Sequence, residues 1–322
     1  MDVLVLGGTS FVGRAIVADL LTRGHTPTLF TRGRTNPEVF PGVARRTGDR
    51  DAGDYTSLAD GRWDAVLDVC GYHSRHVDQA MTAVGEQVGR YLFISTVSVY
   101  DLDQAPEVGL DEEAPRLAEV RDSEDASAFY GGLKVACEND VVARLGPRAT
   151  IVRPGIVAGP WDTTDRFTYW ARRAAAGGTV AVPGRLAQPV QVVDARDLAR
   201  LCTVLLEDDR TGIFNAVGPA EPVTLGGLVE TCAAAAGATV ELVEVAPVER
   251  EKGFPLVLDG PEEDRLFRVS ADAARHAGLP ATALARTAAD TQEWDRGRGT
   301  PPIDRGFSAE QEAGALAGIP GA

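Results

Sequence analysis

The chain has very little lysine. Only two of its 32 Lys and Arg residues are lysines, Lys134 and Lys252. Arginine presents a planar, forked cation, whereas lysine presents a compact point charge. A lysine in so arginine-rich a chain therefore indicates a position that needs a compact cation. Lys134 follows Tyr130 by four residues, and this spacing places both side chains on one face of a helix.

Basic charge, clustered cysteine and long apolar runs are also lacking. The net charge of −15 disfavours nucleic acid as a partner, since phosphate binding needs a basic surface. The four cysteines form no C-x-x-C pair, which predicts neither a metal site nor a disulfide framework. No apolar run reaches membrane-spanning length, and the chain starts directly with a strand rather than a basic leader. We therefore expect a cytoplasmic protein without a membrane or nucleic-acid partner.

The Tyr130–Lys134 pair indicates proton-transfer chemistry. A tyrosine phenol ordinarily has a pKa near 10, and a neighbouring ammonium favours the phenolate and lowers that pKa. A tyrosine tuned in this way can act as a general acid or base when an alcohol and a ketone interconvert. The alternative is an ordinary amphipathic helix with a half-buried tyrosine and a solvated lysine.

The first fifty residues predict a dinucleotide site. The apolar stretch 3–6 is typical of a buried parallel strand, and a helix over 14–23 and a second strand over 26–31 follow. The glycine-rich turn between strand and helix offers backbone N–H groups to a pyrophosphate. Serine replaces the usual middle glycine of the turn, and its hydroxyl can also donate to a phosphate. The predicted contacts in this turn are Gly7, Thr9, Ser10, Phe11, Val12 and Gly13.

The end of the second strand favours NADP(H) as the cofactor. A protein that binds NAD carries Asp or Glu there to bind the ribose 2′-hydroxyl, whereas a protein that binds NADP has an arginine nearby. Here Arg32 and Arg34 follow the strand and no acid does, so we expect them to pair with a 2′-phosphate. NAD(H) stays possible, since both arginines can instead be solvated. Asp49, after the third strand-like stretch, is placed to accept from the adenine amino group.

Further strands are predicted over 64–71, 91–100 and 150–157, with a helix over 75–89. Ser95, Thr96 and Ser98 lie toward the carboxyl end of the 91–100 strand, where ligands bind in open α/β sheets. Cys70 and Gly71, at the exit of the 64–71 strand, are predicted cofactor contacts. The polar segment 101–128 is long enough to be functional or mobile.

These elements predict an α/β fold, a doubly wound Rossmann parallel sheet with a smaller C-terminal α/β substrate region. We expect residues 1–153 and 189–218 to form the dinucleotide-binding domain. Residues 154–188 and 219–296 would then form the substrate region, with helices over 167–176, 225–236 and 283–296. The stretch 297–322, rich in Gly, Pro and Ala, is expected to be a partly ordered tail.

Five motifs in this order resemble the extended short-chain dehydrogenase/reductase superfamily. They are Gly7-Gly8-Thr9-Ser10-Phe11-Val12-Gly13, Ser95-Thr96-Val97-Ser98-Val99-Tyr100, Tyr130-Gly131-Gly132-Leu133-Lys134, Arg153-Pro154-Gly155 and Asp290-Thr291-Gln292-Glu293-Trp294. The stretch from Arg153 to Trp170 is similar to an atypical branch. That branch holds bacterial epimerase/dehydratase-like proteins and the chloroplast stem-loop RNA-binding proteins.

The resemblance implies roles for individual residues. Tyr130 is the implied catalytic acid/base, Lys134 also holds the nicotinamide ribose, and Thr96 hydrogen-bonds the reacting oxygen. Pro154, Gly155, Ile156 and Val157 are expected to flank the nicotinamide carboxamide, and Ser95 to belong to the cofactor site. The superfamily also implies a homodimer through the helices near 75–89 and 130–145.

One departure from the pattern of the superfamily makes two of its reactions, dehydration and decarboxylation, unexpected here. Nucleotide-sugar dehydratases and decarboxylases of this superfamily carry Asp or Glu directly after the catalytic threonine, but Val97 and Ser98 stand here. We therefore expect an NADP(H)-dependent oxidoreductase acting on a hydroxyl or ketone of a sugar-like or small polar substrate. One alternative is a nucleotide-sugar epimerase with retained NAD(H). The other is a non-catalytic dinucleotide-binding protein with a regulatory or RNA-binding role.

Substrate contacts are predicted at His73, Ser98 and Arg166. His73 lies just after the 64–71 strand, close to the expected nicotinamide position, and can also carry a proton. Its alternative is a place at the start of a surface helix. Arg166 can anchor an anionic substrate such as a diphosphate, or can belong to a structural ion pair.

Overall fold

The computed structural model describes residues 1–322 except 86–87, 106–109, 124, 126, 248–253 and 319–322. The chain forms two compact units. The first comprises Met1–Gly155, Ala195–Val217 and Val269–Pro280, and the second comprises Ile156–Asp194, Gly218–Arg268 and Ala281–Ala322. Relative to the expected division, the second unit also contains residues 189–194, residue 218 and the tail, and the first unit also contains residues 154–155 and 269–280. No helix in the described ranges is long and apolar enough to span a membrane.

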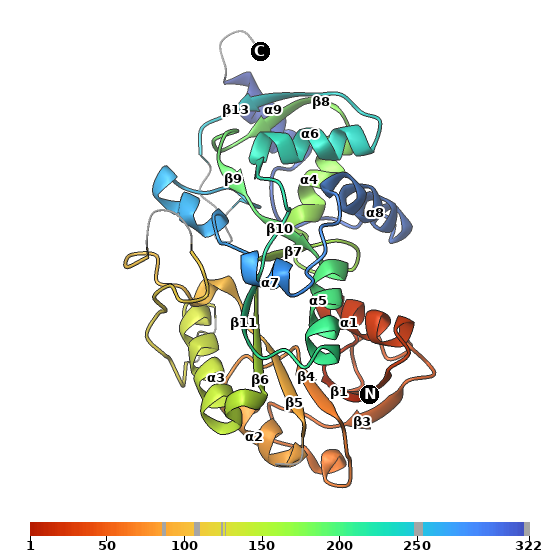
Figure 1. Ribbon diagram of the computed structural model, residues 1–322. Coiled ribbons are helices and arrows are strands. Elements are labelled where there is room, and N and C mark those ends of the chain that lie inside the picture. The colour runs from red at the N-terminus through yellow and green to blue at the C-terminus, as the bar shows by residue number, and fades with distance from the viewer. Residues whose placement is uncertain (86–87, 106–109, 124, 126, 248–253, 319–322) are drawn as a thin grey trace. The chain divides into compact units, whose positions relative to one another are not determined.

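A seven-stranded sheet forms the centre of the first unit (Figure 1). Its strands stand in the order β11-β6-β5-β4-β1-β2-β3, and every neighbouring pair is parallel. In chain order they are β1 (Asp2–Leu6), β2 (Thr26–Thr31), β3 (Ala44–Thr47), β4 (Ala65–Asp68), β5 (Arg90–Ile94), β6 (Ala149–Pro154) and β11 (Gly212–Ala216). The order reverses between β1 and β4, as in a doubly wound dinucleotide-binding sheet, which confirms the predicted fold class.

Helices cover both faces of this sheet (Figure 1). Helix α1 (Phe11–Thr22) packs against α5 (Ala195–Glu207), and α2 (Ser74–Val84) packs against α3 (Tyr130–Leu145). Leu4 and Leu6 join the core cluster that includes apolar residues of α2 and α3. Side chains alternate along a strand, so β1 is buried on both faces and reads as a continuous apolar run. The short helix α7 (Asp272–His276) completes the unit.

The strand predicted over 91–100 ends early, at Ile94. The Thr96 hydroxyl accepts a hydrogen bond from the backbone N–H of Ser98, at 3.1 Å, and caps the 3₁₀ turn η2 (Val97–Val99). The stretch predicted as one strand over 150–157 also divides, into β6 and β7 (Ile156–Ala158). At the division the backbone N–H of Gly155 donates to the carbonyl of Ala216.

The second unit joins small two-stranded sheets and helices (Figure 1). The sheets pair β7 with β10 (Val192–Asp194), β9 (Pro189–Val190) with β12 (Val223–Thr224), and β8 (Gly178–Val182) with β13 (Val240–Glu244). Its helices are α4 (Arg166–Ala175), α6 (Leu225–Ala235), α8 (Leu284–Gly297) and α9 (Ala309–Ala317). The buried Gln292 side chain donates to carbonyls of Ala171 and Cys232, which ties α8 to α4 and α6.

The C-terminal tail contains one of these helices. Ser308 and Gln311 form a reciprocal capping box at the start of α9, a local signal that favours a helix. Glu312 of α9 accepts hydrogen bonds from Arg173 and from the backbone of Ala181. The described part of the tail is therefore packed into the second unit.

Candidate active site

The glycine-rich turn after β1 is shaped by close backbone contacts. Gly7 and Gly8 have φ angles of +111° and +99°, which strain any residue with a side chain. A Cβ on Gly13 would lie 2.7 Å from the nitrogen and 2.9 Å from the Cα of Gly8, so helix α1 presses directly on the turn. Ser10 is the N-cap residue, and its hydroxyl makes no capping hydrogen bond within the described chain. The turn thus leaves the N-terminus of α1 suited to an anion.

The carboxyl end of β2 carries the two predicted phosphate-binding arginines, Arg32 and Arg34, both exposed. The Arg32 guanidinium lies 3.4 Å from the Asp51 carboxylate, and both side chains are more than half exposed. An exposed pair at this distance holds its partners weakly, so Asp51 does not fix the Arg32 guanidinium. Asp49, partly buried beside them, accepts a hydrogen bond from the backbone N–H of Asp51.

Lys134 lies at the carboxyl edge of the sheet, where β4 and β5 end. Its ammonium donates to the carbonyls of Gly71, at 2.8 Å, and Ile94, at 2.6 Å, and the residue is 2% exposed. It also lies over the Phe93 ring, 4.1 Å from the centroid. An ammonium has three N–H donors, so within the described chain one remains for a ligand. Burial lowers the pKa of Lys134 to about 8.

The low pKa of Lys134 can be measured directly because the chain has only two lysines. We expect the Lys134 resonance in protein carrying ¹³Cε-labelled lysine to titrate with a midpoint at pH about 8. The variant Lys252→Arg leaves a single lysine signal and so assigns it. A midpoint near the ordinary lysine value of about 10.4 would contradict the burial of the amine.

The start of α3 is fixed against the turn that follows β5. A Cβ on Gly131 would lie 2.2 Å from the backbone oxygen of Ser98, and one on Gly132 would lie 2.7 Å from the Val120 side chain. Two glycines therefore let the helix approach η2 and the neighbouring chain closely. As a result Tyr130, half-buried in the first turn of α3, stands on the element that packs against Thr96 and Ser98.

The remaining predicted residues differ in their surroundings. The Ser95 hydroxyl donates to the Glu138 carboxylate at 2.5 Å, and the Thr96 hydroxyl donates to Ser98 at 3.2 Å.

The predicted residues after β4 have other surroundings. Burial raises the pKa of the Cys70 thiol, whose sulfur contacts the Leu6 carbonyl at 3.3 Å. His73 is the N-cap residue of α2 and stacks edge-on with His76. Their roles toward cofactor and substrate stay predictions.

Gly155 completes the first unit, whereas Ile156, Val157 and Arg166 belong to the second. Ile156 and Val157 pair with Val192 and Val193 in the β7–β10 sheet. Arg166 begins α4, and its Nε donates to the Thr164 hydroxyl at 3.3 Å. The predicted cofactor and substrate contacts of these three residues also stay predictions.

Two features of the first unit escaped the sequence reasoning. Arg50 and Asp68, both buried, form a double hydrogen bond at 2.6 and 2.8 Å, and Tyr91 donates to the same carboxylate at 2.8 Å. Tyr72 is 50% exposed, and its ring centroid lies 5.7 Å from the Lys134 ammonium. The available signal in the sequence for this neighbour of Lys134 was an aromatic residue directly after Gly71, at the exit of the predicted 64–71 strand.

A comparison with known protein families matches part of the chain. A model of the NAD dependent epimerase/dehydratase family matches residues 72–216, the stretch that holds Thr96, Tyr130 and Lys134. The matched stretch is less than half of the chain, and over that stretch the chain is similar to this family. The predicted resemblance to the extended short-chain dehydrogenase/reductase superfamily is thereby confirmed, and the match supports the predicted type of enzyme. The predicted homodimer stays a prediction.

Individual relatives and solved structures extend the comparison. The chloroplast stem-loop binding protein of 41 kDa b from Arabidopsis thaliana is 28% identical over 96% of this chain and 82% of its own. The 2-alkyl-3-oxoalkanoate reductase of Stenotrophomonas maltophilia is 29% identical over 50% of this chain and 52% of its own. The UDP-glucose 4-epimerase of Thermus thermophilus, solved with NAD, has a TM-score of 0.67 at 20% identity, covering 92% of this chain and 99% of that one. This last likeness shows the fold.

Proposed function

We propose that the chain is an NADP(H)-dependent oxidoreductase that interconverts a hydroxyl and a ketone on a sugar-like or small polar substrate. The observation that carries the proposal is the buried Lys134 ammonium at the ends of β4 and β5, one helical turn from Tyr130. The family supplies the cofactor class. Arg32 and Arg34, exposed after β2 where an NAD reader has an acid, support NADP(H) over NAD(H).

The described residues fit a dinucleotide. Gly7, Gly8 and Gly13 give the turn a form that no side chain permits, and the backbone N–H groups at the N-terminus of α1 would hold a pyrophosphate. The two arginines would hold a 2′-phosphate, and the third N–H of Lys134 would reach the nicotinamide ribose. A bound nicotinamide supplies or takes up the hydride of the reaction.

The chain's own groups handle the oxygen of the substrate. In reduction, Tyr130 gives a proton to the carbonyl oxygen, while the Thr96 hydroxyl turns from Ser98 to donate its single hydrogen bond to that oxygen. The Lys134 cation favours the tyrosinate left behind, and in oxidation the tyrosinate takes the proton back. No acid follows Thr96, so the site has no second acid or base there for loss of water or carboxylate.

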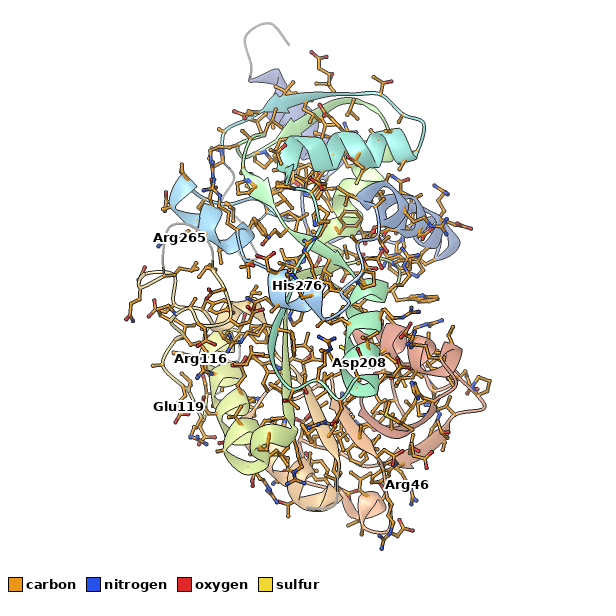
Figure 2. All side chains as sticks on the ribbon, in the orientation of Figure 1. Arg46, Arg116, Glu119, Asp208, Arg265 and His276 are labelled. Atoms are coloured by element: carbon orange, nitrogen blue, oxygen red, sulfur yellow. The ribbon has the colours of Figure 1, made fainter. Side chains whose placement is uncertain are left out.

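The arginines give a test of cofactor choice. We expect Arg32→Ala with Arg34→Ala to weaken NADPH binding by about 10²-fold, since hydrogen bonds to charged groups contribute about 1.5–3 kcal/mol each. NADH affinity should change by less than about twofold, because NADH lacks the 2′-phosphate. Arg46→Ala is the matched control, since Arg46 lies on β3 and pairs with Asp60 (Figure 2). Equal loss for both cofactors in nicotinamide fluorescence titrations would contradict the assignment.

The turnover itself is tested by a substrate screen. Loss of NADPH absorbance is followed with ketones and keto-sugars, with Tyr130→Phe as the blank in every well. Reduction by the natural chain and none by the variant supports the proposal. If both proteins are inactive on the whole panel while a nucleotide sugar is epimerised, the oxidoreductase proposal fails.

Two alternatives have specific support. The family's name favours an epimerase with retained NAD(H), which would show as NAD(H) in the purified protein. The name of the Arabidopsis relative favours stem-loop RNA binding, which a gel-shift titration at physiological salt would detect. The net charge of −15 opposes RNA binding, and the two exposed arginines oppose retained NAD(H).

A further inference from the structure

We propose that Glu138 and Arg153 are positioning residues of the active site, which set the placement of helix α3 relative to the hydroxyl-bearing end of β5. This inference rests on the proposed function, because it concerns how Tyr130 and Lys134 are held opposite Thr96. Glu138 follows Lys134 by four residues and Tyr130 by eight, so all three lie on one side of α3.

The Glu138 carboxylate is the centre of a buried network. Glu138 is 1% exposed and accepts four hydrogen bonds. Three of these bonds come from two residues, namely Ser95, directly after β5, whose hydroxyl donates at 2.5 Å, and Arg153 of β6, whose guanidinium donates at 2.9 and 2.7 Å. The fourth comes from Arg116, at 2.9 Å. One carboxylate of α3 thus joins the residue before Thr96 to the end of β6.

Arg153 extends the network to the segment before α3. Its Nη1 donates to the Tyr100 hydroxyl at 3.0 Å and to the Glu112 carbonyl at 3.1 Å. Tyr100 in turn donates to the Asn215 side chain at 2.7 Å, and Asn215 gives its backbone N–H to the Glu112 carboxylate. Figure 2 places Arg116 and Glu119 of this segment beside α3. Residues 112–116 are therefore held to the same centre as the catalytic helix.

Such an arrangement controls geometry more than it adds stability. A buried ion pair is costly to desolvate, and apolar residues of similar volume often replace it without loss of stability. Its forked, bidentate bonds fix direction and distance. A displacement of about 1 Å between catalytic groups can cost about 10²-fold in rate. The pair therefore acts through Thr96, Tyr130 and Lys134 rather than by touching the substrate.

The first test is Ser95→Ala, which leaves the Glu138–Arg153 pair intact. It removes only the hydrogen bond between α3 and the residue next to Thr96. We expect kcat at saturating NADPH to fall about tenfold, as expected for a smaller displacement of catalytic groups. The dissociation constant for NADPH should stay within about twofold, because the Ser95 hydroxyl donates to Glu138. The melting temperature should fall only slightly, since a single hydrogen bond is lost. Asp140→Asn on the same helix, whose carboxylate pairs with Arg121, is the matched control and should keep full kcat.

The second test replaces the pair by Glu138→Gln with Arg153→Met. The single change Glu138→Gln leaves Arg153 without its carboxylate and is expected to lower the melting temperature. The double variant should recover that temperature but not kcat, which stays about 10²-fold down.

Tyr130→Phe, measured alongside, separates the two proposals. If Tyr130→Phe abolishes turnover while Ser95→Ala and the double variant keep full kcat, the positioning role is overturned and the proposed function stands. If kcat returns together with the melting temperature, the network is only structural and the inference also fails. Unchanged turnover in Tyr130→Phe would overturn the proposed catalytic site itself.

Discussion

Tyr130→Phe is expected to lower kcat by about 10²–10⁴-fold, the usual contribution of a general acid or base. The variant removes one oxygen from a half-buried residue in the first turn of α3 and leaves the ring in place. The Lys134 ammonium keeps both carbonyl partners, Gly71 and Ile94, since neither bond involves the tyrosine. NADPH affinity should therefore stay within about twofold.

The measurement is NADPH oxidation with a carbonyl compound that the natural chain turns over, combined with a fluorescence titration for binding. Tyr72→Phe is the matched control, since it removes the same atom from an exposed tyrosine near Lys134. An equal loss of kcat in both variants would mean that the proton transfer does not depend on Tyr130 alone. Full activity of Tyr130→Phe would refute its role as acid or base.

Gly13→Ala is expected to weaken NADPH binding by about 10²-fold, which corresponds to one or two lost hydrogen bonds to the charged pyrophosphate. The new Cβ would lie 2.7 Å from the backbone nitrogen of Gly8, a distance that real Cβ atoms essentially never show. Because the obstacle is backbone rather than a flexible side chain, the turn or α1 must move. The N–H groups of the turn then no longer converge on one anion.

Gly42→Ala is the control for this change, because a Cβ there meets no heavy atom within 4 Å and the backbone φ is not positive. Fluorescence titration gives the affinity, and a melting curve shows whether the variant is folded. Since both cofactors carry the pyrophosphate, NADH binding should fall as much as NADPH binding. A folded Gly13→Ala protein with natural affinity would exclude this turn as the pyrophosphate site.

The local features of the site could be predicted from the sequence. A strand followed by a glycine-rich turn and a helix is specified within some twenty residues, and the central sheet formed as predicted. The Tyr130–Lys134 spacing likewise needs only the helical period, and α3 contains both residues. These features can be predicted because each depends only on residues that are close together in the sequence.

Ion pairs between residues on different elements could not be predicted from the sequence. Arg50 and Asp68 stand 18 residues apart, and Glu138 and Arg153 stand 15 apart on different elements. Nothing in the identity of a single arginine or glutamate shows that it is buried and paired. The end of β5 was misplaced for a related reason. Val97 and Val99 continue the apolar alternation of a strand, but the Thr96 side chain caps a turn there instead.

The most direct test of NADP(H)-dependent catalysis is to titrate the purified protein with NADPH and NADH, after its absorbance spectrum has been checked for bound cofactor. The expected result is a protein free of nicotinamide that binds NADPH tightly and NADH weakly, with the difference abolished in Arg32→Ala with Arg34→Ala. Tightly retained NAD(H) would contradict this result and favour the epimerase. Binding of neither cofactor would contradict catalysis by any nicotinamide-dependent route.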